Sequence, residues 1–67
     1  MASVAEHPTT WTAAAILAER LRRGWTQAEL AHKLGLHQST VSLIERGLSP
    51  VRAQTNLLLC RVFRYQP

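Results

Sequence analysis

Residues 27–46, QAELAHKLGLHQSTVSLIER, are the stretch that decides the fold of this chain. Its small and apolar residues recur at the spacing of two short helices that cross at a steep angle. These residues are Leu30, Ala31, Leu34, Gly35, Leu36, Val41 and Ile44. The outward positions of the second helix are polar, namely Gln38, Ser39 and Ser42. The pattern predicts a helix-turn-helix that presents polar side chains to a partner.

The turn between the two helices carries the most specific residues. Ala31 suits the close approach of two helix backbones, because a larger side chain would hold them apart. Gly35 suits the sharp reversal of the chain, because glycine readily adopts positive φ. Before the turn, Thr26 and Glu29 form a T-x-x-E capping box that starts the helix ending at Gly35. After it, a third helix is predicted over residues 38–46.

Composition limits the chain to one small basic domain. Its 67 residues are 46% hydrophobic and 18% charged, which suits a folded domain near the lower size limit for a single core. Eight Lys and Arg residues against four Glu and no Asp give a net charge of +4. A basic balance favours polyanions such as nucleic acid or an acidic membrane surface.

Cysteine content and apolar runs indicate the compartment. The single Cys60 excludes an internal disulfide framework and suits a reducing cytosol. The longest apolar run, residues 13–18, is much shorter than the roughly 20 residues that span a bilayer. The N-terminus lacks a basic segment followed by an apolar core, so no secretory signal is expected. We therefore expect a cytoplasmic protein.

The outer parts of the chain complete the predicted organisation. Residues 1–11 show no periodicity and are expected to form a flexible N-terminal arm. The domain is predicted over residues 12–63, with Thr12 as the N-cap of the first helix and Gly24 at its end. Residues 64–67 form the C-terminal tail.

The last helix has an ambiguous register. Ser49 and Pro50 can serve as its N-cap and first residue, but its start is open between residues 51 and 55. Leu57, Leu58 and Leu59 are consecutive, so they cannot all face one small core. We expect Leu58 and Val62 to serve the core. The residues expected closer to a partner copy are Leu57 or Leu59, Phe63 and Tyr65; the alternative is a tail that folds back over its own domain.

The chain resembles the phage repressor and Cro family of helix-turn-helix proteins, also called the xenobiotic-response-element type. The resemblance runs from about Ile16 to Val62. Its motifs are Arg20, Gly24-Trp25-Thr26-Gln27, Glu29-Leu30-Ala31, Leu34-Gly35, Gln38 and Ile44-Glu45-Arg46-Gly47. The resemblance implies an all-α, small four-helix domain of the lambda-repressor-like type. It also implies sequence-specific binding of double-stranded DNA by a homodimer on a near-palindromic operator. A bacterial or phage-encoded protein associated with the nucleoid is expected from the same resemblance.

Roles for single residues follow from the same resemblance, position by position. The expected base-reading residues are Gln38, Ser39 and Leu43. The expected phosphate-contacting residues are Gln27, His37, Ser42 and Arg46. The residues expected to maintain the motif are Arg20, Ala31, Gly35 and Glu45. His37 departs from the family pattern, because a Ser or Thr usually caps this helix.

Three classes of function remain open from the sequence. The first is a transcriptional regulator, most simply a repressor. The second is an antitoxin that uses the same fold and holds a toxin as its partner. The third is an interaction module without DNA binding, against which the outward Gln27 and Gln38 and the positive charge argue. No enzyme, cofactor or metal is expected: the chain has no Asp for a Ser-His-Asp set, and it has no C-x-x-C or H-x-x-x-H pair.

Overall fold

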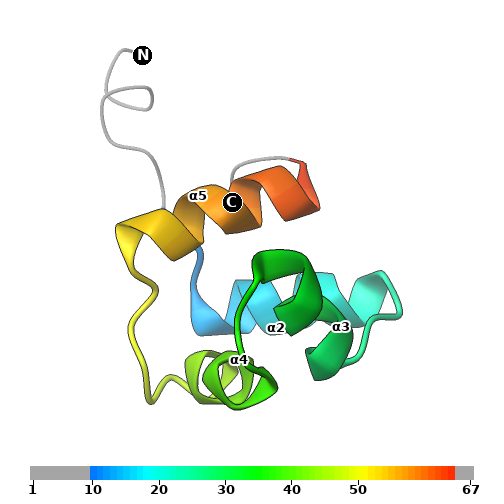
Figure 1. Cartoon of the computed structure of the whole chain (residues 1–67), viewed down its shortest axis with the longest axis horizontal. Helices are drawn as coiled ribbons and strands as arrows, with labels where there is room; N and C mark the ends of the chain where they lie inside the picture. The colour runs from blue at the N-terminus through cyan, green and yellow to red at the C-terminus, as the bar shows by residue number, and fades with distance from the viewer. Residues whose placement is uncertain (1–9, 65–67) are drawn as a thin grey trace.

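The computed structural model describes residues 10–64. Within that range the chain forms four helices and no strand: α2 (Ala13–Arg22), α3 (Gln27–Leu34), α4 (Gln38–Glu45) and α5 (Ala53–Phe63). Figure 1 shows α5 along one side of the molecule and α4 on the opposite side. Helix α3 packs against both of them, and α2 packs against α4. The arrangement confirms the predicted all-α class and the central helix-turn-helix.

Local hydrogen bonds define the starts of α2 and α3 as the sequence predicts. The Thr12 hydroxyl accepts from the backbone N–H of Ala15 at 3.1 Å, which caps α2. At α3 the Thr26 hydroxyl accepts from the N–H of Glu29 at 3.0 Å, and the Glu29 carboxylate accepts from the N–H of Thr26 at 2.7 Å. Both bonds of the capping box are therefore formed, and two otherwise unsatisfied N–H groups gain partners.

The turn between α3 and α4 has the geometry that its glycine predicts. Gly35 has a φ of 70° and donates its N–H to the His32 carbonyl at 3.2 Å. The N–H of Leu36 donates to the Ala31 carbonyl at 2.9 Å, which completes a Schellman motif. Ala31 itself is buried at the crossing of the two helices. A three-residue connection thus reverses the chain and sets α4 against α3.

The core draws on every helix and on the residue before α2. Its buried apolar residues are Trp11, Ile16, Leu30, Ala31, Leu34, Val41, Ile44, Leu59 and Phe63. Trp11, predicted as the last residue of the N-terminal arm, is only 2% exposed, and its backbone N–H donates to Asn56 Oδ1 at 2.7 Å. The folded domain therefore includes Trp11. Residues 1–9 of the predicted arm and 65–67 of the predicted tail lie outside the described residues.

The register of α5 differs from the predicted one. Leu59 and Phe63 are buried, whereas Leu58 and Val62, which we expected in the core, are only half-buried. The reason is aromatic packing: the Phe63 ring lies 4.8 Å from the Trp11 ring and 6.1 Å from the Trp25 ring, measured between centroids. Because residues four apart share a helix face, burial of Phe63 brings Leu59 inward with it.

The start of α5 falls within the predicted range of residues 51–55, but its N-cap is not the one that the sequence suggested. The helix begins at Ala53 with Arg52 as its N-cap, so Ser49 and Pro50 lie in the connection before it. Arg52 makes no side-chain cap hydrogen bond, which explains why no capping signal marked this start in the sequence. Tyr65, expected near a partner copy, lies outside the described residues.

Candidate nucleic-acid interface

Helix α4 has one buried face and one exposed face. Val41, Ile44 and Glu45 point into the domain and are buried. The residues predicted to read bases are all exposed: Gln38 and Ser39 lie in the first turn of the helix, and Leu43, one turn further on, is 39% exposed. The structure thus brings the three predicted base-reading residues together on one accessible surface, on a helix thin enough to enter a DNA major groove.

The residues predicted to contact phosphates surround this surface. His37 is exposed at the start of α4, Arg46 is exposed at its C-cap, and Ser42 is half-buried along its side. His37, the N-cap residue, makes no side-chain cap hydrogen bond to the backbone N–H groups at the helix start. The N-terminal end of a helix dipole favours an anion at such a position.

A buried ion pair fixes α4 against α2. Arg20 donates from Nε to Glu45 Oε2 at 2.7 Å and from Nη2 to Glu45 Oε1 at 3.0 Å, in a two-pronged contact. The side chains of Arg20 and Glu45 are only 10% and 3% exposed. The hydrogen bond to Glu45 raises the pKa of Arg20 above its ordinary value, which keeps the guanidinium charged. Both residues are among those that the family resemblance implies for maintenance of the motif.

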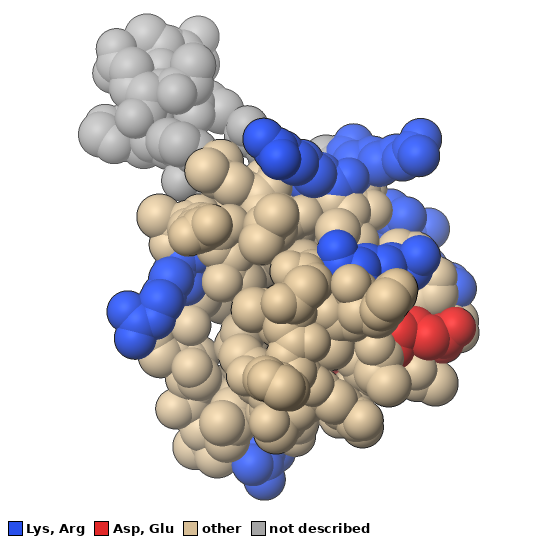
Figure 2. Space-filling view, viewed as in Figure 1, with Lys and Arg blue, Asp and Glu red and all other residues tan. Residues whose placement is uncertain are grey.

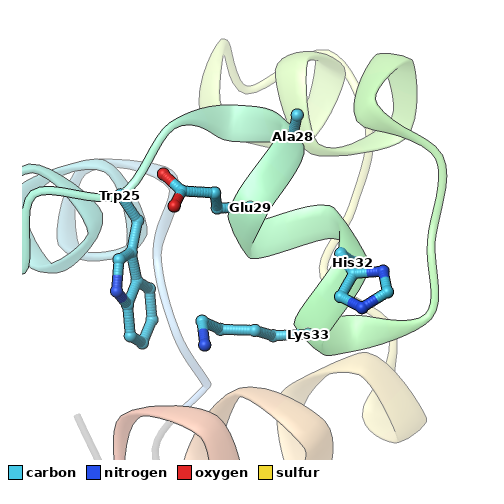
Figure 3. A pocket seen from close by; sticks show the side chains of 5 residues that line it. All are labelled: Trp25, Ala28, Glu29, His32 and Lys33. Atoms are coloured by element: carbon cyan, nitrogen blue, oxygen red, sulfur yellow. The ribbon is translucent and has the colours of Figure 1, made fainter.

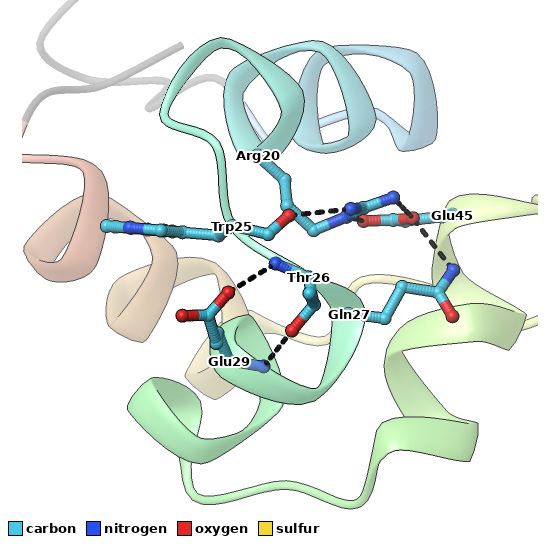
Figure 4. A network of polar contacts seen from close by, with 6 residues as sticks. All are labelled: Arg20, Trp25, Thr26, Gln27, Glu29 and Glu45. Atoms are coloured by element: carbon cyan, nitrogen blue, oxygen red, sulfur yellow. Dashed lines mark hydrogen bonds and ion pairs between the residues drawn. The ribbon is translucent and has the colours of Figure 1, made fainter.

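The same network extends to α3 (Figure 4). Arg20 also donates from Nη1 to the carbonyl of Trp25 at 2.8 Å, at the residue before the capping box. Gln27, the first residue of α3, donates from Nε2 to Glu45 Oε1 at 3.1 Å. The predicted phosphate-contacting glutamine is therefore held against the end of α4. The orientation of α4 depends on side chains from both preceding helices.

Two polar contacts in the structure were not among the predicted ones. Glu19 pairs with Arg22 and with Arg23, whose Nε lies 2.8 Å from Glu19 Oε2. The sequence ERLRR at residues 19–23 contains this signal, because residues three and four apart share a helix face. The side-chain oxygen of Asn56 accepts a hydrogen bond from the backbone N–H of Trp11, which is 45 positions earlier in the sequence. No local pattern in the sequence points to that second contact.

A shallow hollow lies beside α3, away from the exposed face of α4 (Figure 3). It has a volume of about 370 Å³ and is lined by Trp25, Ala28, Glu29, His32 and Lys33. The Lys33 ammonium lies 4.6 Å from the centroid of the Trp25 ring. Hydrogen bonds from Thr26, its backbone N–H first, hold the pKa of Glu29 below its ordinary value. The carboxylate is therefore committed to the start of α3.

Within residues 10–64 no three His, Cys, Asp or Glu side chains gather as metal ligands would. None of the four described helices has the length and hydropathy needed to cross a bilayer.

Comparison with known protein families agrees with this geometry. Residues 16–67 match the model of a family described as helix-turn-helix, so the match covers most of the chain and the whole α3–α4 pair. The family is a DNA-binding one, not an enzyme family, and it includes the domains of Cro and the phage repressors. No match was found among curated proteins or among solved structures. The chain therefore belongs to the Cro/repressor-type helix-turn-helix family and is a DNA-binding transcription regulator of that type.

Proposed function

We propose that this chain is a homodimeric repressor that reads a near-palindromic operator with α4 in the major groove. The observation that carries the proposal is the exposed face of Gln38, Ser39 and Leu43 on a helix held in place by the Arg20–Glu45 pair. A fixed helix can distinguish bases because its side chains keep their positions relative to the groove.

The chemistry of each exposed side chain suits a particular contact. The Gln38 amide matches adenine, because it can donate to N7 and accept from the N6 amino group. Leu43 is apolar and can pack on a thymine methyl group. Arg46, exposed at the end of α4, is placed to pair with a phosphate.

The charge distribution limits the electrostatic part of binding. Among residues 37–46 the only Lys or Arg is Arg46. If each protomer neutralises about two phosphates, a dimer should show a slope of roughly −4 in log K against log salt. Much steeper or absent salt dependence would mean that the duplex contacts a different face of the domain.

The decisive experiment is selection of operators from a randomised duplex pool with the full chain. We expect an enriched sequence with two-fold symmetry and half-sites about one helical turn apart. Failure to enrich any sequence, combined with binding of all duplexes at low salt, would leave only a non-specific DNA-binding protein.

Dimerisation is proposed through the exposed side of α5. Leu57 on this helix is 63% exposed, and a partner copy packed against α5 would remove this apolar side chain from water. We expect wild type to sediment as a dimer and Leu57→Asp as a folded monomer. Leu21→Asp is the matched control, because Leu21 on α2 is 60% exposed and should leave the dimer intact. A wild type that stays monomeric at high micromolar concentration would contradict this part of the proposal.

A further inference from the structure

A second hollow lies between the end of α3 and the end of α5. It has a volume of about 400 Å³ and is lined by Arg23, Trp25, Lys33, Arg61, Val62 and Arg64, which we call the basic pocket. Four of these six residues are cations and none is acidic. Figure 2 shows Lys and Arg side chains gathered on the side of the molecule where α5 ends.

Three of the four cations of the basic pocket form no ion pair with another residue of the described range 10–64. Arg23 is bound to Glu19 and donates from Nη2 to the Phe63 carbonyl at 2.6 Å. Lys33, Arg61 and Arg64 take part in none of the ion pairs found within residues 10–64. The Glu19 carboxylate is bound by Arg23, and the Glu45 carboxylate is bound by Arg20. The Glu29 carboxylate accepts the N–H of Thr26, and the charge of Lys33 is a smaller influence on its pKa. Three like charges around one hollow repel one another, and an anionic ligand would relieve that repulsion.

The pocket also has an apolar part. Trp25 is half-buried and stacks on Phe63 with an angle of 18° between the rings. Lys33 lies over the Trp25 ring at 4.6 Å, and the Arg23 guanidinium carbon lies 5.3 Å from its centroid. Val62, also half-buried, adds an aliphatic surface. A ligand that fits must therefore combine several negative charges with an apolar group.

The basic pocket faces away from the surface proposed to read DNA. In Figure 4 the Trp25 ring extends toward α5, whereas Gln27 and Glu45 lie toward α4. Helices α4 and α5 lie on opposite sides of the molecule in Figure 1. A duplex on the exposed face of α4 would therefore leave Lys33, Arg61 and Arg64 without an anion.

We propose that the basic pocket binds an acidic segment of a partner protein, in which carboxylates flank an apolar side chain. The apolar side chain covers Trp25 and Val62, and the carboxylates pair with Lys33, Arg61 and Arg64. A second DNA duplex fits less well, because its backbone offers no apolar group for the indole and valine surface. A single small anion fits less well too, because the unpaired cations come from two helices.

The direct test uses a synthetic peptide, Glu-Glu-Leu-Glu-Glu, added to the isotopically labelled full chain. We expect shifts in the Trp25 indole N–H signal and in the backbone signals of Lys33, Arg61 and Val62. The neutral peptide Gln-Gln-Leu-Gln-Gln and inorganic phosphate at equal ionic strength should leave these signals in place. Equal shifts with either of them, or a duplex that displaces the acidic peptide from these residues, would overturn the proposal.

Substitutions at exposed positions give the second test. The double variant Lys33→Gln with Arg61→Gln should weaken the acidic peptide by about tenfold or more, as expected when two charge-assisted contacts are lost. Arg52→Gln is the matched control, because Arg52 is an exposed arginine at the other end of α5 and outside the pocket. Unchanged affinity in the double variant, with an unchanged melting temperature, would show that the pocket is not the binding site.

The proposal stands independently of base reading by α4. Peptide binding measured with the protein already bound to a duplex separates the two ideas. We expect the same peptide affinity with and without the duplex, because the two faces do not overlap. A duplex that abolishes peptide binding would place DNA in the basic pocket and overturn the proposal, whereas loss of operator selectivity alone would affect only the repressor assignment.

Discussion

The Arg20 side chain on α2 donates two hydrogen bonds, of 2.7 and 3.0 Å, to the Glu45 carboxylate in the last turn of α4. The two residues are 25 positions apart, so the contact ties separate parts of the motif together. The Glu45 carboxylate also accepts a hydrogen bond of 3.1 Å from Gln27 Nε2, so the first residue of α3 contacts the same group. The Glu45 side chain therefore helps to fix the orientation of α4 relative to both α2 and α3.

Removal of one partner of this pair should destabilise the domain strongly. Arg20→Met leaves the Glu45 charge buried without compensation, and we expect a loss of about 3–5 kcal/mol in the free energy of unfolding. Urea denaturation of the purified chain measures it. The double variant Arg20→Met with Glu45→Met should recover much of the loss, because no buried charge remains. A single variant within about 0.5 kcal/mol of wild type would contradict the buried character of the pair.

Substitutions at the two glutamines should separate base reading from phosphate contact. Gln38→Ala should weaken the preferred operator by about 1–3 kcal/mol and relax selectivity at one base pair in each half-site. Gln27→Ala should weaken all sequences about equally, because phosphates carry no base identity. Binding titrations against a set of single-base operator variants distinguish the two results. If Gln27→Ala changes base preference while Gln38→Ala does not, the proposed placement of α4 is incorrect.

The turn glycine offers a test of backbone strain alone. Gly35 has a φ of +70°, and no heavy atom lies within 4 Å of the place where a Cβ would be added. Gly35→Val should therefore lose about 1–3 kcal/mol through conformation and not through a clash. Gly35→Asn should lose less, because Asn tolerates the left-handed region better than a β-branched residue does. Equal melting temperatures for both variants would argue against strain as the cause.

The capping box should make stability depend on acid pH. The folded-state pKa of Glu29 lies below its ordinary value of 4.5, so the folded chain binds this proton less readily than the unfolded chain does. The stabilisation is thus complete above the ordinary value and is lost as pH falls through the lower, folded-state pKa. Thermal melts between about pH 6 and pH 3 cover this window.

Glu29→Gln is the matched control for the acid dependence. Glutamine can still accept the hydrogen bond from Thr26, but it carries no titrating group. We expect the variant to lose part of the acid-side decline in melting temperature that wild type shows. Identical pH profiles for the two proteins would mean that the Glu29 carboxylate does not contribute.

The helix-turn-helix was predictable because its signals are local. The capping box involves only Thr26 and Glu29, and the chain reversal depends on Gly35. Each feature is determined by residues that are close together in the sequence, so a short segment is enough to predict it. The Arg20–Glu45 contact was accessible only through the resemblance to a known family. Neither residue carries a local pattern that points to the other.

The register of α5 and the basic pocket were not predictable in this way. Phe63 is buried because two tryptophans, Trp11 and Trp25, come together around it from distant parts of the chain. Periodicity could not choose among three consecutive leucines without knowledge of that aromatic cluster. Lys33 and Arg61 likewise meet around one hollow only after α3 and α5 have packed.

The hydrogen bond from Trp11 to Asn56 has a consequence for the kinetics of folding. It joins residues 45 positions apart, whereas the bonds around Gly35 join residues three to five apart. Closing the longer loop carries a larger entropic penalty, so the α3–α4 unit can form before the two ends of the domain meet. Contacts that form after the transition state chiefly govern how fast a protein unfolds. We therefore expect that loss of the Trp11–Asn56 hydrogen bond would speed unfolding of the domain more than it would slow folding.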